Sequence, residues 1–163
     1  DVLETAVILG EDVGLTITLA VCDNALVFGD AARLRQLFLN LVTNAIKYTP
    51  PGGTVELSLR HADDVVTFAV RDTGIGIAAA DLPYIFERFW RADRARSRRT
   101  AGEGGTVERA GFGLGLSISQ WIAQAHGGTL TVVSRLTRGS TFTVALPALM
   151  SSAAPGDSEP ATA

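Results

Sequence analysis

Residues 31–48, AARLRQLFLNLVTNAIKY, carry the clearest structural signal in this chain. Their apolar side chains recur three and four positions apart, as one face of a helix requires; they are Leu34, Leu37, Phe38, Leu41, Val42 and Ala45. Asp30 is a good N-cap residue in front of this segment, and the prolines and glycines at 50–53 stop it. We therefore predict an amphipathic helix over Ala31–Tyr48.

Segments on both sides of this helix alternate apolar and polar residues, which is typical of strands. Strands are predicted at residues 15–21, 25–28, 54–60, 65–71, 129–134 and 140–146, and further helices at 1–10, 81–87 and 114–125. We expect one hairpin with a loop of several residues around Asp63-Asp64 and another around Arg138-Gly139. Because short turns join antiparallel neighbours, the predicted fold class is α+β, a two-layer sandwich with the helices on one face.

Length and composition fit one domain with less ordered ends. The chain has 163 residues, and its 47% hydrophobic content is enough for one contiguous core. We assign residues 1–10 to the end of an upstream linker or helix, 11–148 to the folded domain and 149–163 to a disordered tail. Cys22 is the only cysteine, which excludes an internal disulfide and a zinc site of paired cysteines. No apolar run approaches the roughly 20 residues of a membrane span, so this fragment is not expected in a membrane.

Positive charge gathers in one segment although the net charge of the chain is −3. Residues 88–109 contain seven arginines against three acidic residues. Since the remainder of the chain is strongly acidic, and no aromatic residue lies between Arg91 and Arg109, we expect no nucleic-acid partner. Residues 91–110 show no periodicity and are predicted to form a lid, which either faces an anion or is a solvated basic loop.

Asn40, Asn44 and Lys47 lie at positions i, i+4 and i+7 of the predicted helix, on one side beside its apolar face. A carboxamide oxygen is a hard ligand that can take one position on Mg²⁺ while phosphate oxygens and water take the others. Lys47 could meet phosphate charge from the same face. The structural alternative is that the asparagines bond to neighbouring backbone and that the lysine is solvated.

Asp72-Thr73-Gly74-Ile75-Gly76-Ile77 follows a predicted strand. Glycines let the backbone approach a flat ligand, and the carboxylate can accept a hydrogen bond from an exocyclic amine such as that of adenine. The same letters also fit an ordinary turn. An aspartic-protease site would need a second copy of them, which the sequence lacks.

Gly111-Phe112-Gly113-Leu114-Gly115-Leu116 precedes the last predicted helix. Backbone amides at a helix N-terminus can face an approaching anion. However, this segment does not follow a strand of a βαβ unit, and the chain has no glycine-lysine-serine phosphate loop. The sequence therefore supports neither the dinucleotide-binding fold nor the common nucleotide-hydrolase fold.

Four motifs, in this order, resemble the N, G1, F and G2 boxes of sensor histidine kinases. They are Asn40-Leu-Val-Thr-Asn44-Ala-Ile-Lys47-Tyr48, Asp72-Thr-Gly-Ile-Gly76, Ile85-Phe-Glu-Arg-Phe-Trp90 and Gly111-Phe-Gly-Leu-Gly-Leu116. The resemblance runs from about residue 30 to residue 146, and residues 139–142 match the closing strand of that family. It implies the Bergerat-type ATP-binding fold, in which a mixed five-stranded sheet lies under three helices.

The resemblance implies roles around the phosphates of ATP. Asn44 would be the Mg²⁺ ligand, with Asn40 beside it on metal, water or phosphate. Lys47 would contact phosphate, and Arg88 would approach the terminal phosphate, so these four residues are the implied catalytic set. The G2 box would wrap the phosphates as the lid closes; its residues are Gly111, Phe112, Gly113, Leu114, Gly115 and Leu116.

The resemblance also implies an adenine pocket. Asp72 would bind the adenine amine, and Thr141 would assist through a water molecule. Two side chains would flank the ring and two glycines would shape the pocket; they are Tyr48 with Ile77, and Gly74 with Gly76. ATP and Mg²⁺ are the implied cofactors.

The function that the resemblance implies is phosphoryl donation. The domain would hold Mg-ATP and pass the γ-phosphate to a histidine on a separate dimerisation domain of the same protein, which signals to a cognate response regulator. Neither His61 nor His126 has the setting of that acceptor, so both are interpreted as structural. The fragment would be a monomeric, cytoplasmic domain of a membrane-bound sensor.

Two alternatives stay open on the sequence. An ATP hydrolase of the same superfamily would carry a glutamate base where Asn40 stands, and a carboxamide does not usefully accept a proton at neutral pH. A nucleotide-dependent binding module would dock a partner through its lid and an apolar patch; the patch would consist of Phe86, Phe89, Trp90 and Phe112.

Overall fold

The computed structural model describes residues 1–90 and 113–149. The predicted lid at 91–110, two residues of the G2 box, Gly111 and Phe112, and nearly all of the predicted tail lie outside this part of the chain. The helices are α1 (Val2–Glu11), α2 (Ala31–Tyr48) and α4 (Gly115–Ala125), with a 3-10 turn η1 (Leu82–Tyr84). The strands are β1 (Thr16–Cys22), β2 (Thr54–Ala62), β3 (Val65–Asp72), β4 (Thr129–Arg135) and β5 (Gly139–Pro147).

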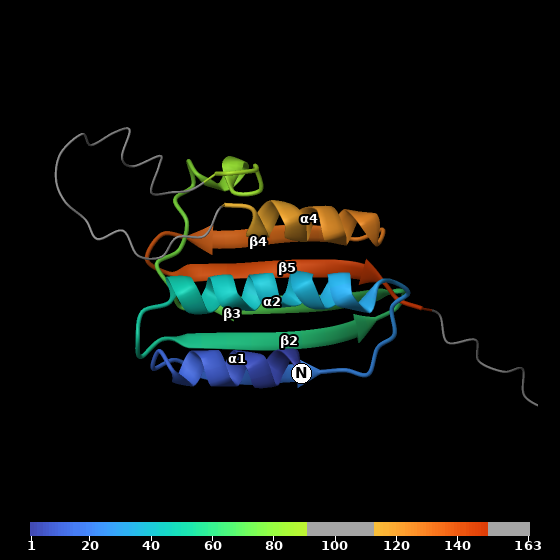
Figure 1. The fold of residues 1–163 in the computed structure, drawn as a ribbon, viewed down its shortest axis with the longest axis horizontal. Coiled ribbons are helices and arrows are strands. Elements are labelled where there is room, and N and C mark those ends of the chain that lie inside the picture. The colour runs from blue at the N-terminus through green and yellow to red at the C-terminus, as the bar shows by residue number, and fades with distance from the viewer. Residues whose placement is uncertain (91–112, 150–163) are drawn as a thin grey trace, which may run out of the picture.

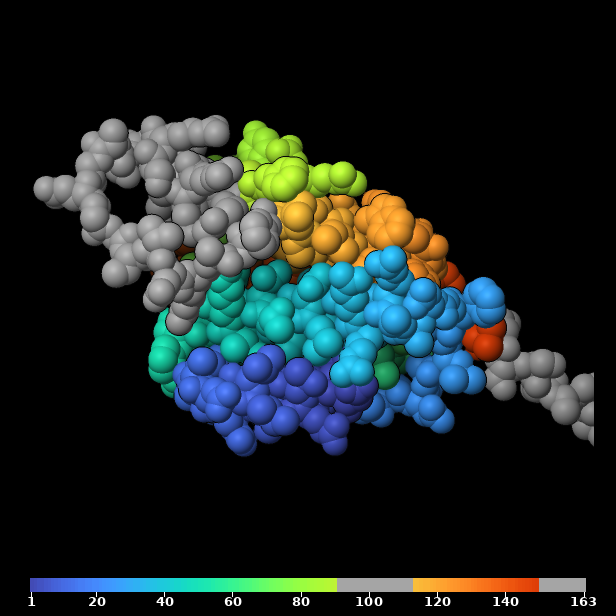
Figure 2. Space-filling view, in the orientation of Figure 1, coloured from blue at the N-terminus to red at the C-terminus, as the bar shows by residue number. Residues whose placement is uncertain are grey.

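These strands form one mixed sheet in the order β1-β2-β3-β5-β4. The β1–β2 pair is parallel, while β2–β3, β3–β5 and β4–β5 are antiparallel. The helices α1, α2 and α4 lie together on one face of the sheet (Figure 1), and the space-filling view shows them side by side across that face (Figure 2). The predicted α+β sandwich of a five-stranded sheet and three helices is confirmed.

Helix α2 is the centre of the helical layer. Its N-cap is Asp30, whose side chain accepts hydrogen bonds from the backbone N–H groups of Ala32 and Arg33, at 2.9 and 3.1 Å. The face that the apolar periodicity predicted is buried against the sheet and the neighbouring helices; its buried residues are Leu34, Leu37, Leu41, Val42, Ala45 and Ile46. At Phe38 the helix packs on β3, with a distance of 4.5 Å between the ring centroids of Phe38 and Phe68.

The sheet has one buried face and one open face, as period-two strands in a two-layer sandwich require. Along β3, Val66, Phe68 and Val70 are buried beneath the helices, whereas Arg71 is exposed on the other side. None of the helices in the described ranges is both long and apolar enough to cross a bilayer.

Three local predictions were wrong. Residues 25–28 form no strand, because they leave the edge strand β1 toward α2 and expose Leu26 and Phe28. The β2–β3 connection is a two-residue turn, since Ala62 pairs directly with Val65. Residues 81–87 contain only the three residues of η1 as regular helix, and their backbone bonds link positions three apart, except that Leu82 bonds four positions back to Ala78.

Candidate functional site

Asp72 ends β3 beneath the helices, with an exposure of only 6%. Its Oδ1 accepts hydrogen bonds from the backbone N–H groups of Gly74 and Ser140, at 2.8 and 3.2 Å. Burial raises the pKa of this carboxyl above its ordinary value of 3.8, and the two backbone bonds oppose that rise only in part. Both bonds use Oδ1, and no hydrogen bond from the described residues reaches Oδ2.

The loop after Asp72 is held by three other segments. The carbonyl of Tyr48, at the end of α2, accepts the N–H of Ile75 at 3.1 Å, and Ser134 Oγ accepts that of Ile77 at 2.8 Å. The carbonyl of Ile75 in turn accepts the N–H of Thr137 at 2.7 Å. The carboxylate is therefore tied to the C-terminal end of α2 and to the β4–β5 turn.

Both glycines of this loop are required by its geometry. A Cβ on Gly74 would collide with the backbone carbonyl of Tyr48, and Gly76 adopts a φ of +66° with the carbonyl of Arg135 directly against it. Only glycine accepts such a conformation and such close backbone at little cost. The tight approach brings the loop against α2 and leaves the Asp72 carboxyl at the end of that helix.

The strand register corrects the expectation for Thr141. This residue pairs with Arg71 on β3, so both side chains lie on the open face of the sheet, away from Asp72. The neighbour of Asp72 on β5 is Ser140, which is buried and whose Oγ is 2.9 Å from Ser134 Oγ. Period-two alternation with the buried Phe142 was the sequence signal that could have identified Ser140.

The three polar residues of α2 that the sequence analysis singled out, Asn40, Asn44 and Lys47, make different contacts. Asn40 donates through Nδ2 to the Gly115 carbonyl at 3.4 Å and to Ser119 Oγ at 3.3 Å, both on α4. Asn44 is half-buried, and its side chain forms no hydrogen bond to the described residues. The Lys47 Nζ lies over the Tyr48 ring, 5.2 Å from its centroid.

In the first turn of α4, beside Asn40, the space next to the Gly115 backbone is not filled by other described residues. No atom of the described residues lies within 4 Å of a Cβ built on Gly115, so packing does not require glycine there. Gly113, by contrast, needs its φ of +71°. Of the two leucines in this box, Leu116 packs against the core, while Leu114 precedes the helix. Ile77, predicted beside adenine, also packs on the core.

Asn40, Asn44, Lys47 and Tyr48 follow one another along α2, and Asp72 lies at the C-terminal end of this helix. Asn40 and Tyr48 are eight positions apart, which is about 12 Å along a helix axis. The buried Asp72 carboxylate therefore lies near the C-terminal end of α2, and the Asn40 carboxamide lies about 12 Å away, beside the backbone that begins α4. The described residues contain no cluster of three or more His, Cys, Asp or Glu side chains that could hold a metal. The hard oxygens of Asn40 and Asn44 nevertheless fit Mg²⁺ when a ligand supplies further oxygens.

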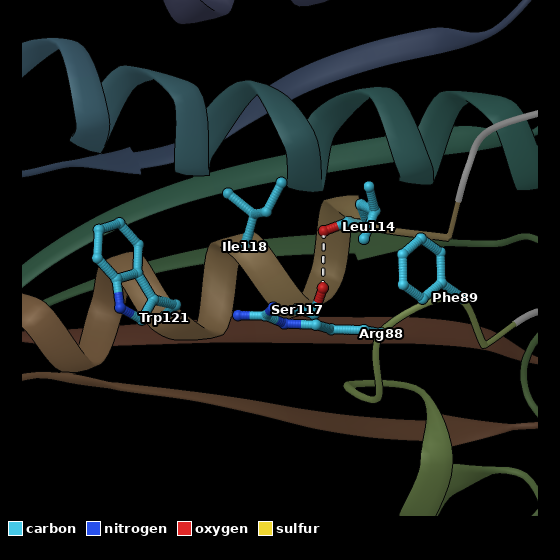
Figure 3. Close-up of a pocket in the computed structure, with 6 residues that line it drawn as sticks. All are labelled: Arg88, Phe89, Leu114, Ser117, Ile118 and Trp121. Atoms are coloured by element: carbon cyan, nitrogen blue, oxygen red, sulfur yellow. Dashed lines mark hydrogen bonds between the residues drawn. The ribbon is translucent and has the colours of Figure 1, made fainter.

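Arg88 does not lie beside Asn40 and Asn44 but in a separate hollow along α4. Figure 3 shows its side chain along α4, where it lines a hollow of about 380 Å³ together with Phe89, Leu114, Ser117, Ile118 and Trp121. The contact with Asn40 uses Ser119, which is about 200° around the helix from Ser117. The described structure therefore does not bring Arg88 to the asparagines, and its contact with phosphate remains a prediction.

Comparison with known proteins shows to which family this chain belongs. The profile of the family described as histidine kinase-, DNA gyrase B- and HSP90-like ATPase matches residues 29–150. The chain belongs to this family. Among its curated relatives, the sensor histidine kinase RppB of Synechocystis sp. is 47% identical over 120 residues, which is 74% of this chain and 24% of RppB. The sensor-like histidine kinase SenX3 of Mycobacterium tuberculosis is 46% identical over 127 residues, 78% of this chain and 29% of SenX3.

Solved structures of histidine kinases share the fold of this family member. The mycobacterial sensor histidine kinase MprB superposes with a TM-score of 0.72 at 27% identity, over 90% of this chain and 92% of MprB. Full-length ShkA, solved in complex with AMPPNP, superposes with a TM-score of 0.76 at 32% identity, over 93% of this chain and 29% of ShkA. The chain thus spans about a quarter of the length of the curated relatives that it matches.

Proposed function

We propose that this domain binds Mg-ATP along α2 and donates the γ-phosphate to a histidine on the dimerisation domain of the same sensor kinase. The observation that carries the proposal is the arrangement of Asn40 and Asn44 along α2, with Asp72 of β3 at the C-terminal end of this helix and Gly115 of α4 beside Asn40. Support also comes from the relatives, which are named as sensor histidine kinases, and from the AMPPNP complex of ShkA.

In this proposal Asp72 binds the adenine base of ATP. Its Oδ2 would accept the exocyclic amine, while Gly74 and Gly76 keep the backbone close enough for a flat ring to lie against the loop. Ser140 holds the carboxylate through its N–H, and the Tyr48 side chain, which is exposed at 44%, would cover the ring from α2. These residues bind and orient the nucleotide and take no part in proton transfer.

The phosphate end would be held by α2 and α4. Bound Mg²⁺ would neutralise phosphate charge, which is most of what phosphoryl transfer asks of a metal. Asn44 and Asn40 would supply carboxamide oxygens to it, and Lys47 would add positive charge from the same helix. The open backbone at Gly115 would let phosphate oxygens approach the N–H groups that begin α4.

The partners follow from the same proposal. The acceptor is a histidine on a helical dimerisation domain of the sensor kinase, and a response regulator receives the phosphoryl group afterwards. We place the domain on the cytoplasmic side of a membrane-bound sensor. His61 and His126 are not acceptors in this proposal, since His61 lies at the end of β2 and His126 holds α2 and α4 together.

Titration of ATP with and without Mg²⁺ tests the site, using the wild type and Asn44→Ala. We expect Mg²⁺ to strengthen binding by the wild type, and Asn44→Ala to weaken Mg-ATP by about 10- to 100-fold, because a hard ligand is lost. The matched control is Thr43→Ala, an exposed neighbour whose hydroxyl bonds only within α2. Equal, metal-independent affinity in all three proteins would contradict the assignment of Asn44.

Labelling with radioactive ATP tests the transfer step. With a histidine-bearing dimerisation domain added, we expect label on that domain and slow phosphate release by this domain alone. Release at several turnovers per second would instead favour an ATP hydrolase. Nucleotide binding that never leads to labelling would favour a nucleotide-dependent binding module.

A further inference from the structure

Ser119 carries a hydroxyl that the proposed site does not yet use. It lies in α4 with an exposure of 0%, and its Oγ is 3.3 Å from Nδ2 of Asn40. Ala123, one turn further along α4, is also fully buried, so small residues suit this helix face. The small size of this position does not by itself explain why it is a serine. An alanine would fill nearly the same space, and it would bury no hydroxyl that needs a hydrogen-bond partner.

The contact determines which end of the Asn40 carboxamide faces α4. The Gly115 carbonyl, 3.4 Å from Nδ2, can only accept a hydrogen bond, so the NH₂ group must face α4. The Ser119 hydroxyl accepts from the same NH₂ group at 3.3 Å. Without it, a single long bond near the geometric limit would hold the carboxamide. Both bonds leave Oδ1 as the atom available to a ligand.

We infer that Ser119 is a positioning residue for the phosphate end of the site: its hydroxyl holds the Asn40 carboxamide so that Oδ1 faces Mg-ATP. This inference rests on the proposed function. The same contact joins α2 to the first turns of α4, the helix that begins at the last glycine of the G2 box. Ser119 does not touch the nucleotide itself and acts only through Asn40.

The first experiment compares the dissociation constants of ATP in Mg²⁺ and in EDTA, and takes their ratio as the gain from metal. We expect Ser119→Ala to reduce this gain by about two- to tenfold, the effect of one lost neutral hydrogen bond. Affinity in EDTA should not change, since the adenine end depends on Asp72. The matched control is Ser117→Ala, because that hydroxyl donates to the Leu114 carbonyl at 2.9 Å on the other side of α4.

A double-mutant cycle separates positioning from packing. Since Ser119 acts through Asn40, we expect Ser119→Ala to have no further effect in an Asn40→Ala background. Additive effects, or an equal loss of affinity in EDTA and in Mg²⁺, would overturn the inference. If Asn40→Ala and Asn44→Ala both leave the gain from metal intact, the proposed function itself fails. If those two reduce it and Ser119→Ala does not, only the role of Ser119 is lost.

A readout that needs no nucleotide completes the test. In nucleotide-free protein, we expect Ser119→Ala to shift the side-chain amide NMR signals of Asn40 and to speed their exchange with solvent. Ser117→Ala should leave these signals unchanged. Unaltered Asn40 signals in folded Ser119→Ala would show that the hydroxyl does not hold the carboxamide, whatever the ATP titrations give.

Discussion

At the scale of single residues, the burial of Asp72 lowers the free energy of unfolding at a position that we propose binds the nucleotide. Asp72 is buried at the position where we propose that its carboxylate accepts the adenine amine, and burial raises its pKa above the ordinary value of 3.8. The folded protein therefore holds more protons than the unfolded chain between the two pKa values. The contribution of Asp72 to the free energy of unfolding then falls as pH rises from about 3.8 through the raised pKa, and this cost persists at neutral pH.

Asp72→Asn removes that cost. We expect the variant to be at least as stable as the wild type at pH 7, with a flatter pH dependence above pH 3.8, because a carboxamide oxygen can still accept the N–H groups of Gly74 and Ser140. We expect its ATP affinity to fall by about 10- to 100-fold, the loss of a charged hydrogen bond. Urea unfolding across pH and nucleotide titration measure the two effects. A clear loss of stability at pH 7 would contradict this account.

At the scale of elements, α2 and α4 form one unit whose two ends are tied differently. Asn40 and Ser119 connect the helices near the start of α4, where we propose that phosphate binds. At the opposite end His126, which follows α4, accepts the N–H of Asp30 at its Nε2 at 3.1 Å and bonds through Nδ1 to the Ile122 carbonyl at 2.8 Å. These contacts agree with the interpretation of His126 as a structural residue.

His126→Ala should remove the hydrogen bond between the start of α2 and the residue that follows α4. We expect a loss of about 1 kcal/mol in the free energy of unfolding, because the Asp30 N–H at the start of α2 loses its acceptor. His61→Ala is the matched control: its side chain is exposed on β2, and a change within about 0.5 kcal/mol is expected. Chemical denaturation measures both. Equal effects of the two substitutions would show that the bridge contributes nothing.

At the scale of the whole molecule, the site is assembled from segments on one side of the sheet. Binding of Mg-ATP should therefore stabilise the entire fold. At a ligand concentration 100 times the dissociation constant, the expected gain is about 2.7 kcal/mol. For a domain of this size it corresponds to a rise of roughly 5 to 10 °C in Tm. Thermal unfolding with and without Mg-ATP measures the shift, and Asp72→Asn should show a smaller one. An identical shift in that variant would contradict the adenine role of Asp72.

Much of this architecture could be predicted from local patterns. The periodicity of α2, its Asp30 cap and the order of the glycine-containing motifs depend on residues close together in the chain, and so did most strand positions. The predicted strand at 25–28 was wrong because alternation alone does not provide a neighbouring strand with which to pair. The hairpin loop at Asp63-Asp64 was shorter than expected because pairing continues to Val65.

Other features depended on how distant segments pack. The register between β3 and β5 decided that Ser140, and not Thr141, lies beside Asp72. The rotation of α4 about its axis decided that Ser119 meets Asn40 while Arg88 lies along a different side of the helix. A motif is a local property of the chain, whereas register and helix rotation are set by which buried surfaces fit together, and that fit exists only once the layers have packed.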